Sequence, residues 1–467
     1  MPVPVLLTNG DQRSALAVAR SLHARGIEVL ALAPDRGGYA SRTRALREVV
    51  VAPRSDADPR AFLEAVRDVV RRRGIGLVVP ISDEDLLALD AARGSFGDVR
   101  LAMAPSESLR LVLDKRANLD LAALHGVPVP REFRLQHRDQ LPEMIAQLGW
   151  PIVLKRPGSP LDPRVPHCPI RVRVLHDRGA LEAALDALPP GAPFPLFQEF
   201  VAGEAYNLVC MAIRGEVVAI HQYQSLRTWE GCGVLRRTVP ADVLLEAHAR
   251  RLLRALDWDG VAHVGFFSDA RTGRTGYMEV NGRFWGSTQV SVDAGWDFPW
   301  WVYRWFVDGE RPEVPALRGG SETVWRYGDL QSLIGYLRGG ASPTPGADPG
   351  ARGAIRDFVG GWFRGARSET FRWNDPGPGL LDARRMLEDA SRLAARALGR
   401  PPPPKASTQP PAVTVALART VLQRLRQAAE SAPATTSDAR PGTGGARAAP
   451  SPSPSPSRPA AASLAGQ

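Results

Sequence analysis

Cysteine and long apolar runs are both scarce in this chain of 467 residues. Only Cys168, Cys210 and Cys232 occur, and they show neither zinc-site spacing nor a disulfide framework. No apolar run approaches the 18 or more residues of a membrane span. The first residues lack a charged segment and a cleavage site, so we find no signal peptide. We therefore expect a reduced, cytoplasmic setting and no membrane span.

Lysine is equally scarce, because arginine supplies nearly all of the 59 positive side chains. The three lysines are Lys115, Lys155 and Lys405. An ammonium is a compact point charge, whereas a guanidinium is a planar fork. The retained lysines therefore either mark places that need a point charge or survive by chance. The net charge is +10, but no dense basic block with interleaved aromatic residues appears, so we expect no nucleic-acid partner.

A dinucleotide fingerprint is also absent from the N-terminal part, residues 1–103. This part alternates strands with helices, which predicts a parallel sheet: strands at 3–8, 27–33 and 75–81, and helices at 14–25 and 61–73. Its first turn lacks G-x-G-x-x-G, which disfavours a dinucleotide oxidoreductase. After the third strand, Ser82-Asp83-Glu84 indicates either the capped start of a helix or a ligand contact at the sheet edge.

We divide the remaining chain by composition and by predicted elements. Residues 104–190 contain two helices and a short strand that ends at Lys155, and residues 191–310 contain two hairpins. Residues 311–400 form a mixed C-terminal extension. Residues 401–467 are rich in Pro, Ala and Ser and contain no aromatic residue, so we expect this tail to be disordered.

One stretch, residues 277–287, carries an acid, an amide and a guanidinium in close order. In a β-strand, Glu279 and Asn281 project to the same face, with Arg283 next if the strand continues. Two oxygen ligands suit Mg²⁺, and an arginine suits a phosphate. The alternative is the polar face of an ordinary edge strand. Residues 261–268 predict the partner strand of a hairpin.

The order of these motifs resembles the ATP-grasp superfamily, closest to its carboxylate–amine ligase branch. The order is Lys115, then Lys155 closing a strand, then residues 198–204, then residues 279–283. The resemblance covers about residues 3–310. It implies an α/β and α+β architecture: a Rossmann-like parallel-sheet domain followed by a two-subdomain ATP-grasp fold.

The resemblance also implies an ATP site. Lys115 and Lys155 would contact the phosphates, which suits a point-like ammonium. Backbone groups of Glu199 and Val201 would bond the purine in a hinge that begins at Gln198. Glu204 would accept hydrogen bonds from the ribose hydroxyls.

For the metal, the resemblance implies Mg²⁺, with Mn²⁺ as an alternative. Glu279 and Asn281 would bind the cation between the phosphates. Arg283, together with Lys155, would be catalytic by stabilising the transferring phosphoryl group.

The implied activity is amide formation from a carboxylate and an amine through an acyl phosphate. The expected partners are these small molecules, and the sequence is compatible with a homodimer. The alternative is a degenerate ATP-grasp protein that binds nucleotide with little or no turnover.

Two departures from the family pattern favour that alternative. The strand before the metal stretch reads Val-Gly-Phe, so Gly265 stands where the family has an acid, and Asp269 is four residues away. The loop after Lys155, residues 157–163, is rich in proline, which lacks the N–H donors that bind phosphates. Arg171 and Arg173 are candidates to compensate. Arg227 is a further candidate cation for the carboxylate or phosphate.

Overall fold

We describe the protein from a computed structural model. The described residues are 2–155, 172–201, 203–229, 232–269, 272–316, 319–340, 342, 348–363 and 365–397. The predicted tail 401–467, the loop 157–163 and Arg171 lie outside them. Among the described residues, no helix is long and apolar enough to cross a membrane.

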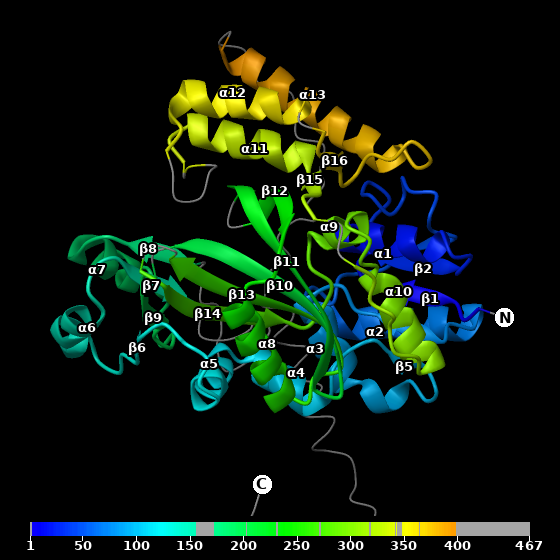
Figure 1. The fold of residues 1–467 in the computed structure, drawn as a ribbon, viewed down its shortest axis with the longest axis horizontal. Coiled ribbons are helices and arrows are strands. Elements are labelled where there is room, and N and C mark those ends of the chain that lie inside the picture. Colours follow the sequence, from blue (N-terminus) through cyan, green and yellow to red (C-terminus); the bar gives the residue numbers. More distant parts are fainter. Residues whose placement is uncertain are drawn as a thin grey trace, which may run out of the picture. The chain divides into compact units, whose positions relative to one another are not determined.

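The first unit is a five-stranded parallel sheet of order β3-β2-β1-β4-β5 (Figure 1). Its strands are β1 (Val5–Leu7), β2 (Val29–Ala33), β3 (Glu48–Val51), β4 (Leu77–Val79) and β5 (Arg100–Leu101). Alternate residues of β1 face opposite layers. Leu6 packs with Phe62 of α2 (Pro59–Arg73), and Val5 packs with Val18 of α1 (Arg13–His23). Helix α3 (Asp83–Ala91) and the short η1 (Arg93–Ser95) complete the unit. The predicted parallel sheet is confirmed.

The second unit is a small antiparallel sheet of order β6-β9-β7-β8. Its strands are β6 (Glu132–Phe133), β7 (Ile152–Lys155), β8 (Arg173–Leu175) and β9 (Leu196–Glu199). The helices that precede and accompany it are α4 (Ser106–Leu113), α5 (Lys115–Leu124), η2 (Arg138–Gln140), α6 (Leu141–Leu148) and α7 (Arg178–Asp186). Because β9 belongs to this sheet, a domain division at residue 190 would cut through it.

The side chains of the small sheet alternate between two faces. Ile152, Leu154 and Phe197 are fully buried with residues of α6 and α7. Val153, Lys155 and Gln198 therefore face the other way, and Val153 pairs with Gln198 across the two strands. This second face carries the residues that the sequence assigned to a nucleotide.

The third unit is a seven-stranded sheet of order β14-β13-β10-β11-β12-β15-β16. Its strands are β10 (Glu204–Ile213), β11 (Glu216–Trp229), β12 (Cys232–Val239), β13 (Gly260–Asp269), β14 (Arg274–Asn281), β15 (Glu322–Val324) and β16 (Arg367–Ser368). Helices α8 (Val243–Ala255), α9 (Thr288–Asp293) and α10 (Phe298–Tyr303) and the π-helical η3 (Arg304–Asp308) accompany it. The predicted hairpin is present as β13–β14, which form one edge of the sheet.

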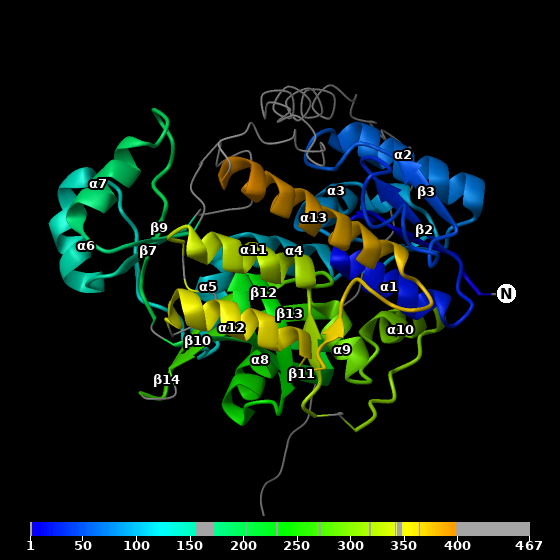
Figure 2. The ribbon, with the colours of Figure 1, turned by 90° about the horizontal axis from the view of Figure 1, so that it is seen from above.

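The C-terminal extension adds β15, β16 and three helices. These helices are α11 (Arg326–Leu337), α12 (Gly350–Phe363) and α13 (Gly377–Ala397), which lie side by side in both views (Figures 1 and 2). Buried ion pairs tie the extension to the other units. Glu369, which is 3% exposed, pairs with Arg236 of β12 and with Arg13 of α1. The extension therefore joins the N-terminal unit to the large sheet.

Candidate active site

Glu279 and Asn281 lie together at the end of β14, with their side chains on one face. Val280 between them is buried in the core, as strand alternation requires. The Asn281 Nδ2 donates to Glu279 Oε1 at 3.0 Å. The strand ends at Asn281, so the condition under which Arg283 would share its face is not met, and Arg283 lies in the loop that follows. Two oxygen-bearing side chains thus share one edge of the large sheet.

Lys115 and Lys155 face this edge from two other elements. Lys155 is the last residue of β7, and Lys115 is the first residue of α5. Burial, and then repulsion by Lys115, lower the pKa of Lys155 to about 8, although the Glu279 carboxylate partly opposes this shift. Burial alone would raise the pKa of Glu279, but the two lysines, Asn281 and His263 together lower it. Two cations and one anion from distant segments therefore form one electrostatic cluster.

Gln198 supplies a polar group without a partner on the same face as Lys155. Its side chain is fully buried, and among the described residues neither its amide nitrogen nor its amide oxygen has a hydrogen-bond partner. A buried amide left unpaired costs about 1–3 kcal/mol. A nucleobase with both donor and acceptor atoms on its edge would supply the hydrogen-bond partners that the Gln198 amide lacks. Val201, also predicted to be near the purine, is buried.

The Glu199 carboxylate is engaged in ion pairs with neighbouring side chains. Its side chain, 3% exposed, accepts hydrogen bonds from Arg131 and Arg274. Burial opposes ionisation, but these partners prevail and lower the pKa of Glu199 to about 2. Its backbone N–H donates to the Arg131 carbonyl at 3.0 Å. A contact from Glu199 to a purine would therefore have to use its carbonyl oxygen.

Glu204, the residue predicted at the ribose, is the first residue of β10. Its Oε2 accepts from Gln224 Nε2 at 2.6 Å and from the Tyr206 hydroxyl at 3.5 Å. The carboxylate is therefore held in place by two neighbours on the sheet. It keeps acceptor capacity, because a carboxylate has about four lone-pair sites.

Arg283 is paired with Asp83 of the N-terminal unit. Its Nε and Nη2 lie 3.2 and 3.4 Å from the Asp83 carboxylate oxygens. Burial opposes the charge of Arg283, but Asp83 raises its pKa. Ser82 caps α3, as one of our two interpretations predicted, and Asp83 is the first residue of that helix. The N-terminal sheet edge therefore reaches the guanidinium that we assigned to phosphate.

Arg227 and Arg173 lie away from this cluster. The Arg227 guanidinium is buried against the Asp329 carboxylate and the Asp357 carbonyl of the C-terminal extension. Arg173 is exposed on β8. The structure therefore gives Arg227 a structural ion pair in place of the expected contact with a substrate. Asp269 pairs with Arg274 in the β13–β14 register, at the far end of the hairpin from Asn281.

Three residues of the site were missed by the sequence interpretation: His263, Asn207 and Tyr223. His263 lies opposite Asn281 in the hairpin, and its Nδ1 is 3.2 Å from Asn281 Nδ2. Its Nε2 lies 3.0 Å from Asn207 Oδ1 and 3.4 Å from the Tyr223 hydroxyl. The hairpin register alone could have located His263, because it stands two residues before Gly265 on the same face.

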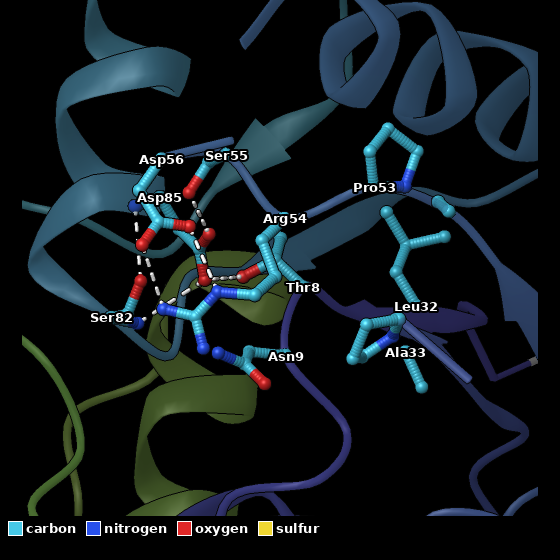
Figure 3. A pocket seen from close by; sticks show the side chains of 12 residues that line it. Thr8, Asn9, Leu32, Ala33, Pro53, Arg54, Ser55, Asp56, Ser82 and Asp85 are labelled. Atoms are coloured by element: carbon cyan, nitrogen blue, oxygen red, sulfur yellow. Dashed lines mark hydrogen bonds and ion pairs between the residues drawn. The ribbon is translucent and has the colours of Figure 1, made fainter. Parts of the chain in front are cut away.

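A small pocket lies at the carboxyl edge of the N-terminal sheet, where Ser82-Asp83-Glu84 was a candidate for a ligand contact (Figure 3). Asp85 lies at its centre and accepts from the hydroxyls of Thr8 and Ser55, both at 2.6 Å. Arg54, beside it, pairs with Asp56. The pocket encloses about 10 Å³, room for roughly one water molecule.

The donor set at Glu279 and Asn281 fits a magnesium ion bound together with phosphates. Among the described residues, no group of three or more His, Cys, Asp and Glu side chains is arranged to hold a metal ion. Mg²⁺ does not require such a group, because it keeps several waters and uses one or two carboxylates with substrate phosphates. One carboxylate and one amide oxygen meet that requirement.

Comparison with known proteins adds the fold. No family model matches the chain, and no curated protein matches it in sequence. Solved structures do match. Biotin carboxylase from Campylobacter jejuni in a β-γ-ATP complex has 14% identity and a TM-score of 0.55, over 68% of this chain and 74% of that chain. The chain has the ATP-grasp fold.

Two further ATP-grasp structures match this chain to a similar extent. The biotin carboxylase domain of 2-oxoglutarate carboxylase from Hydrogenobacter thermophilus, with MgADP, ADP and bicarbonate, has 15% identity and a TM-score of 0.55, over 69% and 74% of the two chains. An L-amino acid ligase from Bacillus licheniformis has 17% identity and a TM-score of 0.51, over 66% and 68%. The expected architecture is thus confirmed.

Proposed function

We propose that this ATP-grasp protein is an ATP-dependent ligase that joins a carboxylate to an amine. The observation that carries the proposal is the convergence of Lys115, Lys155 and Glu279, from three separate elements, in one electrostatic cluster. The unpaired Gln198 amide on the same face supplies a place for the adenine. ATP would therefore lie between the small sheet and the β14 edge of the large sheet.

The proposed role of each residue follows from its charge. Lys115 and Lys155 would bind phosphate oxygens, and Glu204 would accept from the ribose. Glu279 and Asn281 would hold Mg²⁺, which when bound offsets phosphate charge that repels an incoming carboxylate. Arg283 would leave Asp83 and stabilise the transferring phosphoryl group, a role in which one lost donor costs roughly 10²–10³ in rate.

The proposed reaction has two steps. The substrate carboxylate attacks the γ-phosphate, which gives an acyl phosphate and ADP. The amine then attacks the acyl carbon, and inorganic phosphate leaves as the amide forms. No protein nucleophile is required, because the chain needs only to bind, orient and exclude water from the reactants.

The names of the matched structures support a ligase. One is an L-amino acid ligase, and another is a biotin carboxylase with a β-γ-ATP ligand. The competing proposal is a nucleotide-binding protein with little or no turnover. The observation in its favour is Gly265, which leaves no carboxylate directly opposite Glu279 in the register of the hairpin.

The test is ADP release with Mg²⁺, ATP and pooled carboxylates and amines, including the twenty amino acids. A ligase releases ADP over many turnovers only when both a carboxylate and an amine are present, and the Lys155→Met variant should not release ADP under the same conditions. Binding of a non-hydrolysable ATP analogue, measured in parallel, separates the two proposals. Analogue binding without ADP release across the pools would contradict the ligase and favour the nucleotide-binding protein.

A further inference from the structure

Gly265 lies directly opposite Glu279, and a methionine fills the space above it. The register of the hairpin shifts between Gly265 and Phe266, so Met278 and Glu279 together oppose Gly265. A Cβ added to Gly265 would lie 2.8 Å from Met278 Cε and 3.5 Å from its Cβ. The position that would carry a second carboxylate is therefore covered by a thioether, which is a poor ligand for Mg²⁺.

The neighbouring His263 takes part in a hydrogen-bond chain that fixes Asn281. Asn207 Oδ1, 3.0 Å from His263 Nε2, can only accept, so Nε2 carries the proton. His263 Nδ1 is then an acceptor, and Asn281 Nδ2 is its donor at 3.2 Å. The same Nδ2 donates to Glu279 Oε1 at 3.0 Å. Both amide hydrogens of Asn281 are thus engaged, and no donor from the described residues occupies its Oδ1.

From these contacts we infer that the nucleotide site takes one divalent cation rather than two. Glu279 and Asn281 Oδ1 hold this cation, and the His263–Asn207 pair positions Asn281 in place of a second carboxylate. The inference rests on the proposed function, because it assumes that ATP occupies the cleft. It adds the metal stoichiometry and a positioning role for two residues.

The protein supplies one anionic ligand at this position. The cluster holds two lysines and one carboxylate, and Met278 and the neutral His263 add no anion to it. A second cation would have to be held by phosphate oxygens and water alone, without a protein carboxylate of its own.

The experiment counts Mn²⁺ by electron paramagnetic resonance in the full-length protein saturated with the ATP analogue AMPPNP. Calorimetry first establishes that AMPPNP binds. We expect one tight Mn²⁺ per complex, with the six-line spectrum of an isolated ion. Two tightly bound, spin-coupled ions would overturn the inference and leave the proposed function intact. Absence of AMPPNP binding would instead overturn the proposed function, and the inference with it.

Two sets of variants test the assigned roles. Gly265→Glu combined with Met278→Ala restores a carboxylate with room for it, and we expect a second, spin-coupled Mn²⁺. His263→Leu removes the acceptor for Asn281 and should weaken Mn²⁺ binding by about 10-fold to 100-fold, as losses around a metal ligand do. His263→Asn keeps an acceptor near the Nδ1 position and should retain most of the affinity.

Thermal unfolding of each variant separates positioning from packing. If His263→Leu and His263→Asn lower the melting temperature equally but only the first weakens Mn²⁺ binding, His263 acts by positioning Asn281. Equal Mn²⁺ affinity in His263→Leu and the unchanged protein would overturn the positioning role.

Discussion

Replacing Lys155 by methionine removes one of the two ammonium groups that we place on the ATP phosphates. A hydrogen bond to a charged partner is worth about 1.5–3 kcal/mol, which corresponds to a loss of affinity of roughly 10-fold to 150-fold. Calorimetry with Mg²⁺ and AMPPNP measures the change. Lys405→Met is the matched control, because it removes the third lysine of the chain, outside the described residues. We expect this control to bind normally.

The pH dependence tests the same residue independently. The pKa of Lys155 is lowered to about 8 by burial and by Lys115. Phosphate favours the charged form, so affinity is full below pH 8 and falls as pH rises through 8. A group with a pKa of 8 is about 90% deprotonated at pH 9, so affinity should drop by about tenfold from pH 7 to pH 9.

The Lys155→Arg variant provides the reference for this experiment. Arginine stays protonated throughout this range. Its profile therefore reports the titration of the nucleotide and of other groups, and the difference between the two profiles belongs to Lys155. Unchanged nucleotide affinity and rate in Lys155→Met, or identical pH profiles in the two proteins, would refute the assignment of Lys155 to the phosphates.

Three further predictions concern other parts of the chain. Asp83→Asn releases Arg283 from a partly exposed ion pair worth about 0–1 kcal/mol. Calorimetry should therefore show AMPPNP binding up to about fivefold more tightly, and weaker binding would contradict this. Arg236→Met removes one of the two buried partners of Glu369, which keeps Arg13, and should lower the free energy of unfolding by about 1.5–3 kcal/mol, measured by urea denaturation. The neighbouring Arg237→Met, at an exposed pair, should cost under about 1 kcal/mol; equal losses would refute the distinction. The pKa of Glu199 is lowered, so its contribution to stability is present above about pH 5 and lost towards pH 2. The melting temperatures of Glu199→Gln and the unchanged protein should therefore converge on acidification. A constant difference between them would contradict this.

The sequence was most informative where local pattern determines structure. Buried runs at β1, β2 and β4, with helices α1 and α2 between them, predicted the parallel sheet, because periodicity and caps are local signals. The side-by-side placement of Glu279 and Asn281 followed from strand alternation. The scarcity of lysine indicated Lys155 before its surroundings were known. In the structure these residues belong to one electrostatic cluster, on which the proposed ATP site is built.

The sequence could not show contacts between distant segments. The sequence left open whether the strand continues to Arg283, and the partner of Arg283, Asp83, is 200 residues away in the chain. Arg227 was one candidate cation for the carboxylate or phosphate, and the sequence could not show its partner Asp329, which lies on a helix 102 residues further on. His263 was overlooked because it carries no motif, and only the hairpin register and Asn207 on the next strand give it a role.

A structure of the protein with AMPPNP and Mg²⁺ tests the central claim most directly. We predict one nucleotide per chain, with its adenine beside Gln198 and its phosphates beside Lys115 and Lys155. We also predict one cation on Glu279 and Asn281. A nucleotide bound at the carboxyl edge of the N-terminal sheet, beside Thr8 and Asp85, would contradict the account, as would a cleft in which these lysines do not contact phosphate.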